Sequence, residues 1–242
     1  MTDVRSAGLE FGVTRRAPLL EELRGFLADA EGTVGLDFSF GLPRTVLAEA
    51  GALPEDGWVE FLAWFRERFG DADAPEMQET LREWGRDSED QGVEHKRRTD
   101  AERAANSPYS NITRHQTLHG IRDVLAPLVE ENVVSVQPMA PTAGVPTLLE
   151  IYPAATLRDL GLPDRRYKEP GPEARERRER ILDGLRRWGV TLPERFDEAV
   201  LDDADGDALD SLVAAVATAN AADSEFEVEG KHYDPVEGYI YI

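Results

Sequence analysis

Two acidic residues lie one turn apart at the start of a predicted helix near the C-terminus, in the segment DGDALDSLVAAVATANA (205–221). At about 100° per residue, Asp207 and Asp210 share a face with small residues, while the opposite face carries leucine and valine. We expect such a helix to be buried. Buried carboxylates at this spacing repel each other unless a cation compensates them, so the pair predicts a divalent-metal site. Helix capping is the alternative for either acid taken alone.

Two further acids lie at the predicted carboxyl ends of strands. Asp37 is on the polar side of the strand-like segment TVGLDFSFGLP (33–43), and Glu150 lies in PTLLEIYP (146–153), just before a proline that can open a helix. Open α/β sheets place their sites at that edge, although each acid alone could cap the next helix. Together with the helix pair they make four carboxylates, a set that suits two Mg²⁺ or Mn²⁺ ions about 4 Å apart and phosphodiester hydrolysis.

The elements that must position these acids mix helical and strand patterns. Besides the acid-bearing helix, helical spacing predicts helices within 17–32, 57–70, 74–85, 113–131 and 173–189. Strand patterns occur at 33–43, 132–139, 146–153 and 226–242, and the charged stretch 85–111 predicts a long loop. This order indicates an α/β fold. We expect one domain over residues 1–242, with a helical insertion at about 43–128.

Composition narrows the class of protein. The absence of cysteine excludes disulfides, thiolate metal sites and a cysteine nucleophile. No apolar run reaches membrane-spanning length and the first residues do not read as a secretion signal, so we expect a cytoplasmic protein without a membrane partner. The net charge of −21 and the scarcity of lysine predict a halophilic, acidic protein. Because the Debye length falls to about 3 Å at 1 M salt, this acidity does not exclude nucleic acid as a partner.

Seven segments carry a family resemblance. The chain contains, in this order, VGLDFSFGLP, KRRTD, SPYSNITRHQTLHGIRDVLAPL, LLEIYPAATLRDLG, YK, GDALDSLVAAVATA and EGYIYI. In these it resembles domain of unknown function family four-two-nine, regarded as predicted nucleases of the RNase H-like fold, over nearly its whole length. The resemblance implies a mixed RNase H-like sheet flanked by helices, with Asp37 at the acidic position of the fourth strand. Asp207 and Asp210 would take the helix position, which also resembles the final helix of Holliday-junction resolvases.

The beginning of the chain departs from that family. Relatives open with an aspartate-bearing strand, and here Glu10 is the only acid in a comparable strand-like position. We therefore expect either that the first strand or strands are absent, or that the start of this chain is internal to the true gene. Their loss would leave the strand of Asp37 with an unpaired edge and an uncovered apolar side formed by Leu36, Phe38 and Phe40. Such an edge would favour a homodimer.

Other residues whose side chains could bind a metal or a phosphate indicate a site less clearly. His115 and His119 have the spacing of a zinc-protease helix, but glutamine replaces the glutamate base, and a pair of surface histidines is favoured. The arginines of 173–189 could contact phosphates, although the glutamates between them favour a solvated helix face. No phosphate-binding glycine loop occurs.

These observations predict a metal-dependent nuclease acting on DNA or RNA. The predicted catalytic residues are Asp37, Glu150, Asp207 and Asp210, and all of these except Glu150 would bind metal. Arg98 and Lys168 would bind the substrate. Two alternatives stay open: a catalytically inactive nucleic-acid-binding module of the same fold, and a nucleotide-binding phosphotransfer protein.

Overall fold

The computed structural model describes residues 16–55, 57–86, 92–231 and 233–242. The chain divides into two compact units, each described by itself. We call residues 14–150 and 226–240 the sheet unit, and residues 151–225 with 241–242 the helical unit. Glu10 lies outside the described residues, so the expected absence of the first strand or strands stays a prediction.

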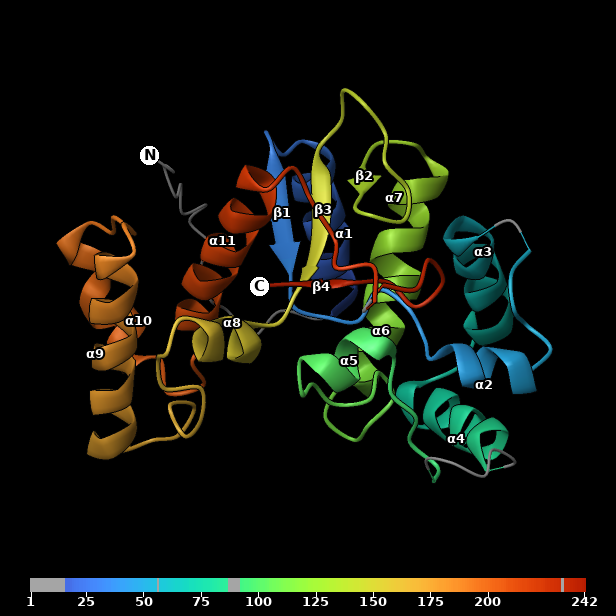
Figure 1. The fold of residues 1–242 in the computed structure, drawn as a ribbon, viewed down its shortest axis with the longest axis horizontal. Coiled ribbons are helices and arrows are strands. Elements are labelled where there is room, and N and C mark those ends of the chain that lie inside the picture. Colours follow the sequence, from blue (N-terminus) through green and yellow to red (C-terminus); the bar gives the residue numbers. More distant parts are fainter. Residues whose placement is uncertain (1–15, 56, 87–91, 232) are drawn as a thin grey trace. The chain divides into compact units, whose positions relative to one another are not determined.

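A small parallel sheet forms around the central strand β3 (Thr147–Ile151). Its parallel neighbours are β1 (Thr33–Leu36) and β2 (Ser135–Val136), and β4 (Ile240–Tyr241) also pairs with β3. Figure 1 shows β1 and β3 side by side, and their register sets Leu36 opposite Glu150. The last four residues of β3 are all buried, as expected for the central strand of a parallel sheet. The predicted α/β class is confirmed in this coarse form.

Most helices of the sheet unit follow β1. The unit contains α1 (Arg16–Ala28), α2 (Arg44–Glu49), α3 (Trp58–Phe69), α4 (Ala74–Gly85), α5 (Arg98–Glu102), α6 (Arg114–His119), a π-helical segment (Gly120–Leu125) and α7 (Ala126–Glu130). The helices predicted within 17–32, 57–70, 74–85 and 113–131 are confirmed. The start of α4 illustrates why: the side chain of Asp73 accepts a hydrogen bond from the backbone N–H of Glu76, and the carboxylate of Glu76 accepts one from Asp73.

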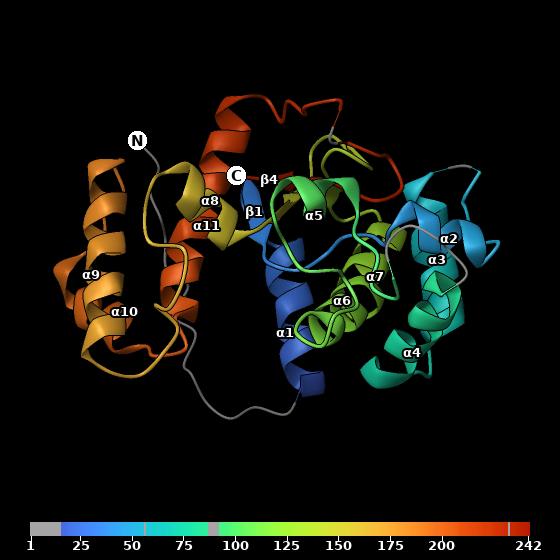
Figure 2. The same cartoon turned by 60° about the horizontal axis from the view of Figure 1, so that its bottom comes forward.

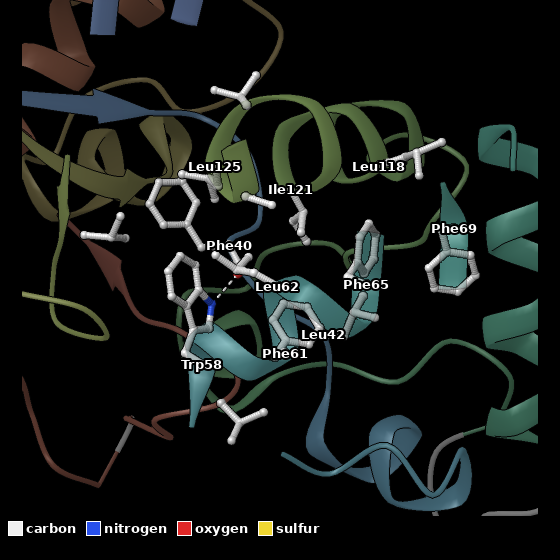
Figure 3. Packing of buried hydrophobic residues seen from close by; sticks show 14 of the residues in the cluster. Phe40, Leu42, Trp58, Phe61, Leu62, Phe65, Phe69, Leu118, Ile121 and Leu125 are labelled. Carbon is white, nitrogen blue, oxygen red and sulfur yellow. Dashed lines mark hydrogen bonds between the residues drawn. The ribbon is translucent and has the colours of Figure 1, made fainter. Parts of the chain in front are cut away.

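Aromatic side chains fill the core of the sheet unit. Figure 3 shows Phe40 beside Trp58, whose indole N–H donates to the carbonyl oxygen of Phe40 at 2.7 Å. Phe61 and Phe65 of α3 pack in the same core with ring centroids 5.8 Å apart. Leu36 and Phe38 are partly buried against this core and Phe40 is fully buried. The expectation of an uncovered apolar side on these residues is therefore wrong.

Four predicted elements differ from the structure; of the strand predicted over 132–139, only Ser135–Val136 forms a strand. The strand predicted over 33–43 ends at Leu36, because the next segment turns into the core and its backbone bonds to side chains, as at Phe40. The predicted loop at 85–111 contains the short helix α5, whose Asp100 accepts a hydrogen bond from the backbone N–H of Arg97. Of the strand-like residues 226–242 that the structure describes, only those of β4 form a strand.

The helical unit contains α8 (Pro153–Asp159), α9 (Pro172–Arg187), α10 (Asp197–Asp202) and α11 (Asp207–Asp223). Figures 1 and 2 both show α9 and α10 side by side, and α11 contacts α8, α9 and α10. Their apolar side chains form a second core, which includes Leu157, Ile181, Leu185, Leu209 and Val213. Across the described parts of the chain, none of the helices has the length and hydropathy needed to cross a bilayer.

Candidate functional site

The two acids at the start of α11 lie beside a lysine and a tyrosine of the helical unit. One carboxylate oxygen of Asp210, Oδ1, accepts a hydrogen bond from the Tyr167 hydroxyl at 2.7 Å. The other, Oδ2, forms an ion pair with Nζ of Lys168. Both oxygens of Asp210 therefore have partners from the segment before α9.

Asp207 and Asp210 differ in exposure. Asp210 is buried, with 8% of its surface exposed, whereas Asp207 lies at the surface. The expectation that both acids lie on the packed face therefore holds for Asp210 only. Partial burial raises the pKa of Asp207; the charge of Lys168 lowers it, and the charges of Asp203, Asp210 and Asp205 raise it further. The net shift is upward. Burial is the largest cause of that shift.

Glu150 lies in a different environment, bound to Arg97 in the interior of the sheet unit. The Arg97 guanidinium donates to both carboxylate oxygens of Glu150, and the backbone N–H of Phe40 donates to Oε2 at 3.0 Å. Arg97 also forms an ion pair with Asp100, and all three charged side chains are almost completely buried. Burial raises the pKa of Glu150 against the opposing effect of Arg97. The Glu150 carboxylate, predicted as catalytic, is therefore engaged by an internal cation.

The C-terminal segment contacts Arg97 through Glu237. The Arg97 guanidinium also donates to the carbonyl oxygen of Glu237 at 3.0 Å. The Glu237 carboxylate accepts from the backbone N–H groups of Arg44 and Arg98 at 2.7 and 2.8 Å. Burial raises the pKa of Glu237 as well. Sequence reasoning missed Arg97 and Glu237 as central residues. Both lie in quoted segments, KRRTD and EGYIYI, but nothing local indicates that these two segments meet.

Asp37 directly follows β1, at the same edge of the sheet as Glu150. Leu36, its neighbour, is opposite Glu150 in the parallel register, and Asp37 is exposed. Asp37 and Glu150 belong to the sheet unit, while Asp207 and Asp210 belong to the helical unit. The convergence of all four acids on one metal pair stays a prediction. Within the described residues, no group of three or more histidine, aspartate or glutamate side chains has the geometry of a metal site.

The comparison with protein families decides the membership of the chain. The profile of a family described as "Protein of unknown function (DUF429)" matches residues 14–232. The chain belongs to this family. The match covers β1, β3 and the acid-bearing helix α11. Searches of curated proteins and of solved structures found no match.

Most basic side chains on α9 of this DUF429 protein are engaged within the chain. Arg175 forms ion pairs with Glu198 and Asp202, and Arg186 forms one with Asp197. These contacts favour the solvated-face interpretation of α9 over a row of phosphate contacts. Nδ1 of His119 contacts Oδ2 of Asp123 at 2.7 Å.

Two other arginines of the DUF429 protein line a pocket near Lys168. Arg166 and Arg177 border a pocket of about 230 Å³ at the start of α9, together with Glu169 and Glu173. Arg98, the other predicted substrate-binding residue, is exposed in the sheet unit, and its backbone N–H binds Glu237.

Proposed function

We propose that the chain is a metal-dependent nuclease that hydrolyses phosphodiester bonds in DNA or RNA. The observation that carries the proposal is the first turn of α11, where Asp207 and Asp210 lie beside the ammonium group of Lys168. A positive charge already occupies a position among these acids. Carboxylate oxygens are the ligands that Mg²⁺ and Mn²⁺ prefer, so the donor chemistry fits either ion.

Asp207 and Asp210 would hold the metal in this proposal, and Asp37 stays a predicted metal ligand. When bound, Mg²⁺ or Mn²⁺ lowers the pKa of a coordinated water and stabilises charge on the phosphate, and a second ion would stabilise the leaving oxygen. Tyr167 fixes the orientation of the Asp210 carboxylate through its hydroxyl. Lys168 and the arginines of the adjacent pocket, Arg166 and Arg177, provide positive charge for the substrate.

Glu150 has a positioning part in the proposal. Its carboxylate is held by Arg97 and by the backbone N–H of Phe40, and its strand pairs with the residue before Asp37. The buried ion pair therefore fixes the end of β1 from which Asp37 projects.

A nuclease assay tests the proposal. Single-stranded, duplex, hybrid and junction substrates are incubated with the chain in Mg²⁺, Mn²⁺ or chelator. Cleavage requires the divalent cation, and Asp210→Asn or Asp207→Asn lowers its rate at least about 100-fold. Asp223→Asn is the matched control, because Asp223 is an exposed acid in the last turn of the same helix, and its rate stays at the level of the unchanged chain.

Other outcomes favour the alternatives. Cleavage that resists chelator and survives Asp207→Asn contradicts the proposal. Nucleic-acid binding without cleavage and without a response to Mg²⁺ indicates an inactive binding module, and ATP turnover without cleavage indicates a phosphotransfer protein.

A further inference from the structure

The ammonium group of Lys168 lies at an unusual position for a cation. It contacts Oδ2 of Asp210 in the first turn of a 17-residue helix, where the helix dipole disfavours positive charge. Nearby acids provide the compensating attraction, since Asp203, Asp205, Asp207 and Asp210 all lie within or just before that turn. The ammonium group is held by Asp210, and its charge also acts on Asp207.

The backbone at the start of α11 is shaped for the lysine side chain. Gly206, immediately before the helix, has a φ of +76°, in the left-handed region that favours glycine. A Cβ atom at this position would lie 2.9 Å from Cγ of Lys168 and 3.3 Å from Cε2 of Tyr167. The aliphatic part of Lys168 therefore crosses the helix start where a side chain is lacking. The missing Cβ lets the lysine reach Asp210.

The ion pair between Lys168 and Asp210 joins an exposed side chain to a buried one. The Lys168 side chain is 44% exposed, whereas that of Asp210 is 11% exposed. The ammonium can move into solvent while the carboxylate stays in place, because the Tyr167 hydroxyl continues to hold Oδ1. An exposed lysine on a flexible stem makes a weak ion pair that opens readily.

We propose that Lys168 is a tethered counter-ion that competes with a divalent cation for Asp210. This inference rests on the proposed function, because it takes Asp207 and Asp210 as the metal ligands. Lysine has three donors and no acceptor, so its ammonium cannot share Oδ2 with a metal ion without strong repulsion between the two cations. A divalent ion binds Asp210 only after the ammonium group has left.

Two consequences follow from the tether. First, the metal affinity is lower than the carboxylates alone would give, because binding must break the ion pair. Second, the displaced ammonium stays within a side-chain length of the site, where it can meet the negative charge of a phosphate. Lys168 thereby neutralises Asp210 in the metal-free chain and is available to the substrate in the metal-bound chain.

Isothermal titration with Mn²⁺, in the absence of nucleic acid, tests this competition. Lys168→Met keeps an unbranched side chain and removes the charge, and we expect its Kd for Mn²⁺ to be about tenfold lower than that of the unchanged chain. Lys168→Arg keeps the charge, and its Kd stays within about twofold of the unchanged chain. Lys231→Met is the matched control: it removes one positive charge from an exposed lysine that pairs with Glu229 in the sheet unit, and it leaves the Kd unchanged.

A second readout keeps the test informative for a destabilised variant. Lys168→Met loses thermal stability in chelator, because it leaves the acids uncompensated, and regains it in excess Mn²⁺. Lys168→Gln serves as a second neutral variant and is expected to behave in the same way.

The outcomes separate this inference from the nuclease proposal. A Kd that is unchanged or raised in both neutral variants overturns the inference alone. Absence of Mn²⁺ binding in every protein overturns the inference together with metal ligation by Asp207 and Asp210. Tighter Mn²⁺ binding without cleavage of any substrate supports the inference and contradicts the nuclease.

Discussion

Removing either partner of the buried Arg97–Glu150 pair should destabilise the chain by different amounts. Arg97, Asp100 and Glu150 are each 2% exposed or less, and together they carry one positive and two negative charges. Arg97→Met leaves two carboxylates without a cation, and we expect the free energy of unfolding to fall by about 3–5 kcal/mol. Glu150→Gln leaves Arg97 paired with Asp100, so only charge-assisted hydrogen bonds weaken, at a cost of about 2 kcal/mol.

Urea unfolding followed by circular dichroism measures both changes. Arg66→Met is the matched control, because Arg66 pairs with Glu130 on the surface, with side chains 43% and 71% exposed, and it should cost about 1 kcal/mol or less. The reasoning is refuted if Glu150→Gln costs more than Arg97→Met, or if Arg97→Met costs no more than the control. Glu150→Gln should also leave the Kd for Mn²⁺ unchanged. A weakened Kd would show that Glu150 ligates metal despite its contact with Arg97.

Three further predictions concern the metal-free chain. Because the pKa of Asp207 is raised in the folded state, the folded chain holds this proton more tightly, and the contribution of Asp207 to stability falls as the pH rises above about 4. Asp207→Asn should lessen that fall in melting temperature in chelator, and an unchanged profile contradicts the assignment. Gly120→Ala should cost about 1–3 kcal/mol in urea unfolding, because its Cβ would lie 2.3 Å from the Phe38 ring. Gly25→Ala, with no atom within 4 Å, should be neutral or stabilising by up to about 1 kcal/mol. Finally, the net charge of −21 predicts a melting temperature that rises from dilute buffer to about 2 M KCl, and a flat or falling curve counts against it.

Helices were predictable where the deciding interactions are local. The first turn of α4 is fixed by Asp73 and Glu76, three residues apart, and its apolar spacing continues to the glycine at its end. The acid-bearing helix α11 was predicted in the same way, from its spacing of small and apolar residues. In α4 the two bonds that set the N-terminal boundary join residues three apart.

The predicted strand that contains Asp37 is longer than β1 because its alternation of apolar and polar residues is compatible with two structures. Leu36, Phe38 and Phe40 alternate as in a strand, but they also suit a loop that inserts its aromatic side chains into a core. The choice depends on partners far along the chain: Phe40 binds the carboxylate of Glu150, 110 residues away, and the indole of Trp58, 18 residues away. No local pattern contains that information.

The helix acids illustrate a finer limit of periodicity. Residues three apart on a helix are separated by about 60° around its axis, so both can face one way or straddle the boundary of the packed face. Asp207 and Asp210 straddle it, since the first is exposed and the second is buried against Tyr167. The position of that boundary is set by α8, α9 and α10, which the spacing within α11 does not reveal.

Arg97 and Lys168 separate the predicted acids into two kinds. Arg97 reaches Glu150 from 53 residues away, is 1% exposed, and directs its planar guanidinium at Glu150, Asp100 and the Glu237 carbonyl together. Removing the guanidinium would leave the buried carboxylates without a counter-ion. An external cation could therefore reach Glu150 only at a large cost in free energy. Lys168 forms an ion pair with Asp210 from a side chain that is 44% exposed, and its departure exposes a carboxylate at the edge of solvent. The sequence shows four similar acids. The burial and geometry of their counter-ions make Asp210 open to exchange and Glu150 closed, which is why the metal proposal depends on α11.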